Sequence, residues 1–227
     1  MMATPATLLA GTVPTILPVL GRPYRRVLDL GCGSNRTLSE LALDAAAVRI
    51  GVDVAVPVLQ SAQRQIPNVR YAAADAHALP FPKDWFDLVI AKVALPYTHI
   101  PSALRELHRV LCAGGCLWIT LHPFRMALAS LLQELRAGRL GNAAFRAYVI
   151  ANGLLFDFTG REVRFPLTHG RIESCQSVRG ITRALTSAGF TDVQFEMRRR
   201  GAGHAADDRR YGPVFAVAAR KAAAARA

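Results

Sequence analysis

The sequence contains few cysteines, and their spacing argues against a metal site. The four are Cys32, Cys112, Cys116 and Cys175, and none of them forms a Cys-x-x-Cys pair or a histidine–cysteine spacing typical of zinc. We therefore expect no bound metal. Reduced thiols in a cytoplasmic protein are the simplest interpretation.

Long uninterrupted apolar runs are also missing. The apolar stretch at residues 8–20 is broken by Pro14 and Pro18 and has no basic flank, so it resembles neither a signal peptide nor a membrane span. We expect a protein without a membrane-spanning segment, located in the cytoplasm.

A dense basic stripe is absent as well, although the formal net charge of the 227 residues is +12. The arginines are scattered and do not alternate with aromatic residues, as they would in a nucleic-acid interface. A nucleic-acid partner is therefore not expected, and the sequence gives no indication of the oligomeric state.

What the sequence does contain is an alternation of short β-rich runs and helical patterns, which predicts a doubly wound α/β sheet. The expected strands are 27–30, 48–54, 69–73, 86–91 and 116–121, and the expected helices between them are 37–46, 56–65 and 101–111, with Pro101 at the first helical position. A helix at 178–188 and strands at 193–197 and 214–219 complete the pattern, the last two as an antiparallel hairpin.

The chain is long enough for one domain, 1–227, with an N-terminal segment at 1–23 and an insertion at 123–176. The insertion is too long for a simple connection, so we expect it to be a lid with a functional role. It contains two helix-like segments and turn and strand signals around 156–165.

Glycines and acidic residues follow the first three expected strands. Gly31 and Gly33 come after the first strand, Asp53 closes the second and Asp75 closes the third. A glycine bend before a helix N-terminus allows close approach of a ligand, and an aspartate about 20 residues later can accept hydrogen bonds from ribose hydroxyls. Each acidic residue alone is more often a solvated charge, but together they predict a nucleotide-like ligand.

A nicotinamide dinucleotide is a poor candidate for that ligand. The dinucleotide fingerprint has a third glycine three residues after the second, and Arg36 occupies that position here. The sequence also lacks a second mononucleotide-binding half.

Residues 24–121 resemble the class I S-adenosylmethionine-dependent methyltransferases in five motifs. These are 27–35 (VLDLGCGSN), 51–53 (GVD), 74–81 (ADAHALPF), 86–91 (FDLVIA) and 104–115 (LREL…AGG). The third and fifth motifs are most similar to the small-molecule enzymes of the ubiquinone and menaquinone type. The resemblance implies a seven-stranded, Rossmann-like sheet of order 3-2-1-4-5-7-6, with the last strand antiparallel, and S-adenosyl-L-methionine as the cofactor.

The same resemblance implies a role for individual residues. Asp29 would orient the glycine bend near the methionyl ammonium of the cofactor, and Gly31 and Gly33 would line its path. Asp53 would hold the ribose, with Val54 against the adenine. The adenine would also meet Asp75 and Ala76, and Ala91 would pass near the methionine moiety.

The methyl acceptor is less well defined. Tyr97, His99 and His122 are candidates for contact with it, and His99 is our candidate general base, although a capping or solvent-facing role for His99 is equally compatible with the sequence. Aromatic and aliphatic residues of the insertion predict a pocket wall and a small, apolar or aromatic acceptor. These residues are Phe145, Tyr148, Leu154, Leu155, Phe156, Phe158 and Phe165, with His169 and Glu173 as polar candidates.

Two alternatives stay open. One is a methyltransferase that acts on RNA or protein, which the basic composition favours. The other is a non-catalytic accessory protein, because Asn35 replaces a glycine that is frequent in the family and Lys92 puts a cation near the expected sulfonium position.

Overall fold

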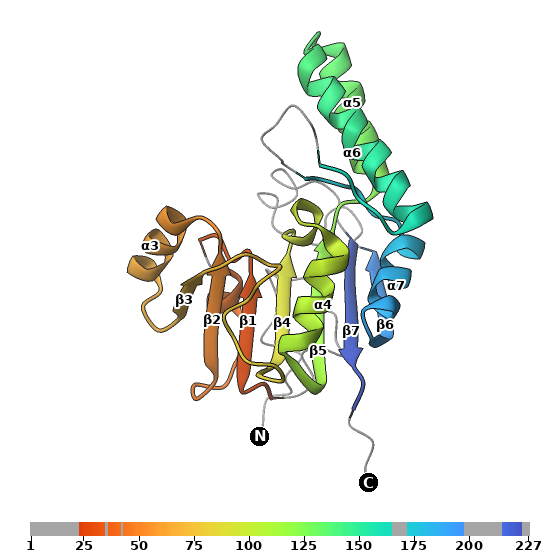
Figure 1. Ribbon diagram of the computed structural model, residues 1–227. Coiled ribbons are helices and arrows are strands. Elements are labelled where there is room, and N and C mark those ends of the chain that lie inside the picture. Colours follow the sequence, from red (N-terminus) through yellow and green to blue (C-terminus); the bar gives the residue numbers. More distant parts are fainter. Residues whose placement is uncertain (1–22, 35, 42, 165–171, 198–214, 224–227) are drawn as a thin grey trace, which may run out of the picture.

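The computed structural model describes residues 23–34, 36–41, 43–164, 172–197 and 215–223, and its centre is one seven-stranded sheet (Figure 1). The strands are β1 (Arg26–Leu30), β2 (Val48–Asp53), β3 (Arg70–Ala73), β4 (Phe86–Lys92), β5 (Leu111–Leu121), β6 (Phe190–Met197) and β7 (Phe215–Lys221). Their order is β3-β2-β1-β4-β5-β7-β6. Strands β1 to β5 pair in parallel, whereas β7 is antiparallel to both β5 and β6. The fold expected from the sequence is confirmed.

Both faces of the sheet are covered, which explains why the central strands are apolar throughout. The side chains of β4 alternate between two clusters of buried apolar residues, one on each face of the sheet. Val89 and Ala91 belong to the larger cluster, and Leu88 and Ile90 belong to the other. Helix α4 (Ile100–Val110) covers the first side through an apolar stripe of helical period. Its five buried residues are Ile100, Ala103, Leu104, Leu107 and Val110.

The helices agree with the sequence pattern except near their ends. Helix α3 (Val56–Gln65) has the expected bounds and α7 (Val178–Ser187) ends one residue earlier. Helix α2 (Arg36–Glu40) is much shorter than the expected 37–46. Within the rest of that range, the Asp44 carboxylate accepts a hydrogen bond from the backbone N–H of Ala46 at 2.8 Å and forms a turn. In α4 the N-cap is His99, so Pro101 is the second helical residue and not the first.

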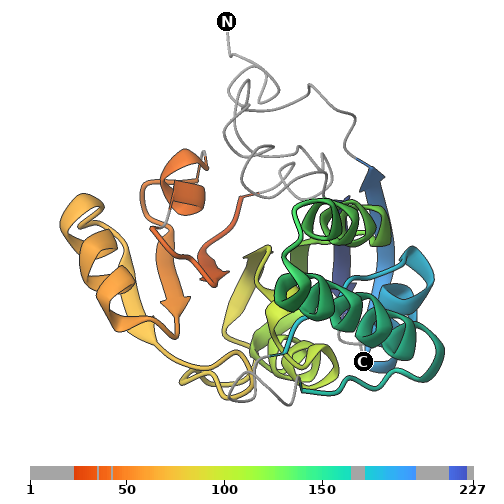
Figure 2. The same ribbon diagram turned by 90° about the horizontal axis from the view of Figure 1, so that it is seen from above.

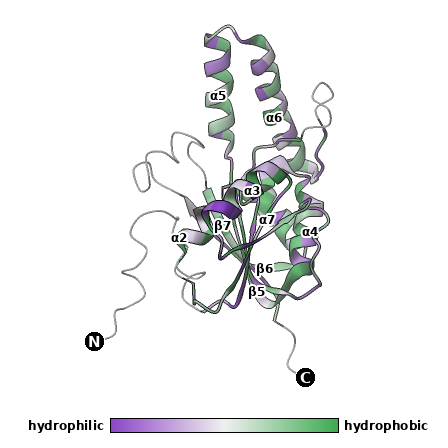
Figure 3. Ribbon diagram, turned by 90° about the vertical axis from the view of Figure 1, so that its left-hand side faces the viewer, coloured by the Kyte–Doolittle hydropathy of each residue, from purple (hydrophilic) through white to green (hydrophobic). Residues whose placement is uncertain are grey.

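The insertion after β5 is a helical hairpin. Helices α5 (Phe124–Arg136) and α6 (Leu140–Thr159) rise together beyond the edge of the sheet where the parallel strands end (Figure 1). Seen from above, the hairpin lies on the β5–β7 side and α3 lies at the opposite edge (Figure 2). Apolar and polar residues both occur along the two helices (Figure 3). The turn and strand signals around 156–165 begin within a helix, because α6 continues to Thr159. Gly160 caps it with a left-handed φ of 74°.

Several sequence expectations fall outside the described residues. These are most of the N-terminal segment 1–23, Asn35, Phe165, His169 and the connection between β6 and β7. Within the described ranges, no helix has the length and apolar character needed to cross a membrane.

Candidate functional site

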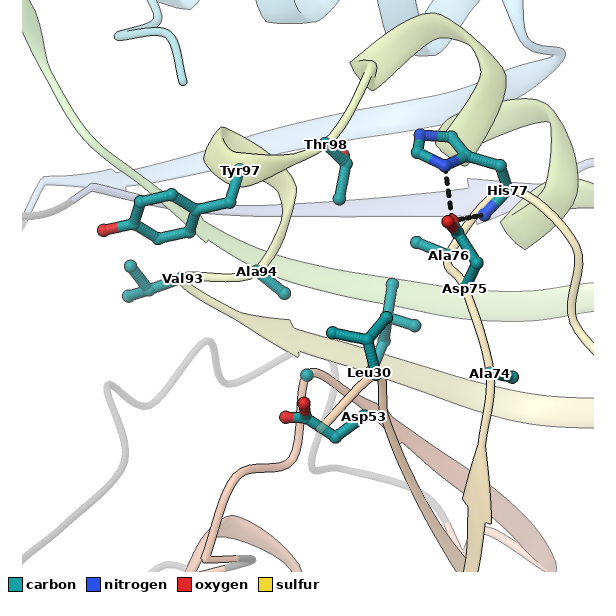
Figure 4. Close-up of a pocket in the computed structure, with 12 residues that line it drawn as sticks. Leu30, Asp53, Ala74, Asp75, Ala76, His77, Val93, Ala94, Tyr97 and Thr98 are labelled. Carbon is teal, nitrogen blue, oxygen red and sulfur yellow. Dashed lines mark hydrogen bonds and ion pairs between the residues drawn. The ribbon is translucent and has the colours of Figure 1, made fainter. Parts of the chain in front are cut away.

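A pocket of about 320 Å³ lies where β1, β2, β3 and β4 end (Figure 4). This edge of a doubly wound sheet, beside the point where the strand order reverses, is the usual ligand site of such folds. The lining residues are Leu30, Gly31, Asp53, Val54, Ala74, Asp75, Ala76, His77, Val93, Ala94, Tyr97 and Thr98. Five of the eight expected cofactor-binding residues are among them: Gly31, Asp53, Val54, Asp75 and Ala76.

The glycine bend after β1 forms the floor of the pocket. Gly31 has a φ of 67° and Gly33 a φ of 51°, a region that favours glycine. A Cβ atom added at Gly31 would lie 2.6 Å from the Cβ of Ala94. Only glycine at this position therefore lets the turn after β4 approach the turn after β1.

Asp53 ties the glycine bend to the end of β2. Its carboxylate accepts hydrogen bonds from the backbone N–H of Gly33 at 3.1 Å and of Ala55 at 3.0 Å. A carboxylate has about four lone-pair sites, so it can accept further bonds from a ligand. Val54 is next to it on the rim and is 71% exposed.

Asp29 lies beneath the bend and is 1% exposed, and its buried Oδ2 has no hydrogen-bond partner in the described part of the chain. Burial raises the pKa of its carboxyl to about 7, and the positive charge of Lys92 limits this rise. The charge of Lys92 therefore acts on this buried carboxyl. A buried carboxylate oxygen without a partner suits the ammonium group of a ligand.

Asp75 lies on the rim and contacts His77. Its Oδ1 accepts a hydrogen bond from the backbone N–H of His77 at 2.9 Å and a second contact from His77 Nδ1 (Figure 4). The backbone hydrogen bond is the main reason why the pKa of Asp75 is below its ordinary value. Because His77 Nε2 accepts the backbone N–H of His99 at 3.1 Å, the ring proton of a neutral His77 is on Nδ1, facing Asp75.

His77 lines the pocket but was not singled out from the sequence. The available signal was its position two residues after Asp75, where an aspartate side chain commonly accepts a backbone hydrogen bond.

Three expected cofactor-binding residues do not line the pocket. Ala91 is fully buried in the core cluster that packs on α4. Asp29 is buried, and Gly33 is connected to the pocket through the hydrogen bond that its backbone N–H donates to the lining residue Asp53.

His99 is not a lining residue either. Its Nδ1 lies 2.8 Å from the hydroxyl of Ser102 in the first turn of α4, and burial is the main factor that lowers its pKa. Its backbone N–H contacts the lining residue His77, but the His99 ring does not line the pocket, and its assignment as a general base remains a prediction.

Tyr97 and His122 do lie together. Tyr97 lines the pocket, and its ring meets the ring of His122 edge to face with centroids 5.7 Å apart. His122 follows β5 and is 5% exposed. The side chain of Tyr97 therefore connects the pocket to the base of the hairpin.

The apolar residues of the insertion have different surroundings. Phe156 is fully buried in the main core, while Phe158 is 71% exposed. Phe145 and Tyr148 pack on each other with centroids 5.7 Å apart, and the Tyr148 hydroxyl donates to the carbonyl of Val163 at 2.7 Å. None of these residues lines the described pocket.

The centre of the chain is similar to a known protein family. Residues 28–119 match the family model described as "Methyltransferase domain". The malonyl-[acyl-carrier protein] O-methyltransferase of Halorhodospira halophila is 37% identical over 136 residues, which cover 55% of this chain and 46% of that protein. The demethylmenaquinone methyltransferase of Renibacterium salmoninarum is 34% identical over 119 residues, covering 49% of this chain and 50% of that protein. The chain thus spans about half the length of these curated relatives.

Solved structures share the fold over nearly the whole chain. The S-adenosylmethionine-dependent methyltransferase structure from Methanosarcina mazei has a TM-score of 0.60 and 19% identity, and the match covers 94% of this chain and 100% of that one. This similarity shows the fold. The family match of residues 28–119 and the matches to curated relatives agree with the resemblance that the sequence motifs carry.

Proposed function

We propose that this chain, whose residues 28–119 match the methyltransferase-domain family, is a class I S-adenosylmethionine-dependent methyltransferase that transfers a methyl group from that cofactor to a small molecule. The observation that carries the proposal is the convergence of the glycine bend, Asp53 and Asp75 on one pocket, with the buried carboxylate of Asp29 beneath it. The sequence places these residues on three different strands, and the fold brings them to one hollow.

The residues present suit the cofactor. Asp53 has lone pairs left for the ribose hydroxyls, and Val54 offers an apolar surface at the rim for the adenine. Asp75 and Ala76 lie on the opposite wall, where Asp75 would accept a hydrogen bond from the adenine amino group. Asp29, whose Oδ2 finds no partner among the residues that the structure describes, would face the ammonium. When bound, the cofactor supplies an electrophilic methyl group on sulfur.

This chain's own residues would align the acceptor with that methyl group and exclude water, which is what an in-line displacement requires. The turn after β4, including Tyr97, and the helical hairpin beyond β5 are the elements next to the pocket that are available for this task. A small, apolar or aromatic acceptor remains our preferred class. The acceptors named for the relatives, malonyl-acyl-carrier protein and demethylmenaquinone, differ widely, so they do not define the acceptor here.

The proposal is tested by calorimetry of the full chain with S-adenosylmethionine and with S-adenosylhomocysteine. We expect both to bind at one site. Absence of binding by either would contradict the proposal and favour a non-catalytic accessory role. Asp44→Ala is a matched control for changes at the site aspartates, because Asp44 is an exposed aspartate that also accepts a backbone N–H and lies outside the pocket lining.

A further inference from the structure

The helical hairpin carries the bulkiest apolar side chains that the protein leaves exposed. Among the large apolar side chains exposed in the described ranges, every leucine and phenylalanine lies on this hairpin, while those elsewhere are valines and Tyr97. Apolar side chains gathered on one projecting element mark an interaction surface, whereas single ones scattered over a protein do not. The six on the hairpin are Leu128, Leu132, Leu135, Leu140, Leu154 and Phe158.

On α5 the exposed leucines form one row with two arginines. Leu128, Leu132 and Leu135 are spaced by four and three residues, which puts them on one side of a helix. Arg125 precedes Leu128 by three residues and Arg136 follows Leu132 by four, so these two exposed arginines flank the same row. The five side chains occupy about a third of the helix circumference, and we call them the α5 face.

The exposed charge of the hairpin has one sign. Its two acidic residues, Glu134 and Asp157, are not exposed. Glu134 pairs with Arg139 at 2.6 Å, and Asp157 accepts a hydrogen bond from the N-cap residue of α7. Arg125 and Arg136, in contrast, form no ion pair with any residue in the described part of the chain. The α5 face is therefore apolar and positively charged, and it is complementary to an anionic partner with an apolar layer.

We propose that the α5 face binds the surface of an anionic lipid membrane. The three leucines enter the apolar boundary beneath the lipid headgroups, and the long side chains of Arg125 and Arg136 place their guanidinium groups at the level of the phosphates. Apolar burial and electrostatic attraction add together in this mode of binding, and the helix lies along the membrane without crossing it.

A membrane surface fits the hairpin better than an acidic protein does. A groove in a protein contacts one row of side chains on a helix, whereas the exposed apolar side chains continue past α5 to Leu140, the first residue of α6. A fluid lipid surface accommodates side chains distributed in this way. The hairpin and the pocket also lie at the same edge of the sheet (Figure 1), so membrane binding would bring the pocket close to apolar molecules dissolved in lipid.

The test is co-sedimentation of the full chain with two kinds of vesicle, phosphatidylcholine alone and phosphatidylcholine mixed in equal parts with phosphatidylglycerol. We expect binding to the anionic vesicles, weakened by added salt, and little binding to the neutral ones. Leu128→Ser, Leu132→Ser and Leu135→Ser combined should reduce the affinity about tenfold or more, because their apolar area no longer leaves water. Arg125→Gln with Arg136→Gln should reduce it about fivefold for each arginine.

Two matched controls lie at the opposite edge of the sheet, around α3 (Figure 2). Val56→Ser with Val58→Ser makes the apolar-to-polar change on exposed side chains of α3. Arg64→Gln with Arg70→Gln removes the same charge from exposed positions of α3 and β3. Both controls should bind vesicles as the wild type does, which separates the α5 face from the overall net charge.

Circular dichroism verifies that each variant is folded, and the arginine pair keeps the test decisive if the leucine variant is not. Wild-type chain that binds neither vesicle would overturn the inference in favour of an acidic protein partner. Equal binding to both vesicles, or folded α5-face variants that bind as the wild type does, would overturn it as well. Wild-type dimers in sedimentation velocity that the leucine changes convert to monomers would assign the face to a second copy of the chain. Binding of S-adenosylhomocysteine is measured separately, and its outcome bears only on the proposed function.

Discussion

Replacing Asp29 by asparagine should stabilise the ligand-free protein at alkaline pH while weakening cofactor binding. The carboxyl of Asp29 is buried, and its pKa rises from 3.8 to about 7, mainly through burial. At 1.36 kcal/mol for each pKa unit, ionising this carboxyl at pH 8 costs the folded state about 4 kcal/mol relative to the unfolded chain. Asparagine has nearly the same shape and cannot ionise, so Asp29→Asn removes this cost.

The direction of the pH dependence follows from the two protonation states. The unfolded chain loses the Asp29 proton near pH 4, whereas the folded protein keeps it until about pH 7. Between these values the folded state binds more protons, so raising the pH favours unfolding. The wild type and Asp29→Asn should therefore be similarly stable near pH 4. Their difference should grow through pH 4–7 and level off above pH 7, with the variant the more stable.

Urea unfolding monitored by the fluorescence of the two tryptophans measures this difference at a series of pH values. The comparison cancels other titrating groups, such as Glu162, whose pKa is also raised to about 7 by burial. Calorimetry with S-adenosylmethionine should show a loss of affinity on the order of tenfold or more in the variant, because a carboxylate partner for the ammonium is gone. A variant that is less stable at pH 8, or a difference that does not change with pH, would refute the reasoning.

Three further predictions concern the pocket and the hairpin. Asp53→Ala should cost about 1–3 kcal/mol of cofactor affinity, from lost hydrogen bonds to a charged group; an unchanged dissociation constant in calorimetry would count against the ribose role. Gly31→Ala should lower the melting temperature and the cofactor affinity together, because its Cβ would lie 2.6 Å from that of Ala94 at a positive φ; wild-type values for both would contradict the described approach of the two turns. Phe156→Ala should destabilise the fold by about 3–5 kcal/mol, whereas the exposed Phe158→Ala should change it by less than about 0.5 kcal/mol; equal effects in urea unfolding would show that the two side chains have similar surroundings.

The sequence alone determined the sheet and the location of the site. Apolar runs of strand length that alternate with apolar residues at helical spacing indicate a doubly wound sheet, because each strand or helix must bury its apolar side against another element. The glycine bend before α2 and the aspartate that ends β2 were identified by position. Gly31 and Asp53 line the pocket, and Asp53 also accepts a hydrogen bond from the backbone N–H of Gly33. These features are local in the chain, so residue type and spacing reveal them.

The tertiary structure decided where individual side chains point. Ala91 was expected near the ligand but packs in the core, because the pleat of β4 turns it to the face that α4 covers. His99 faces Ser102 and not the pocket. Gln176, absent from the sequence argument, is 1% exposed, and its backbone N–H donates to the carbonyl of His122, which is far away in the chain. Burial and hydrogen-bond partners come from contacts across the fold, and residue type and spacing along the chain do not specify them.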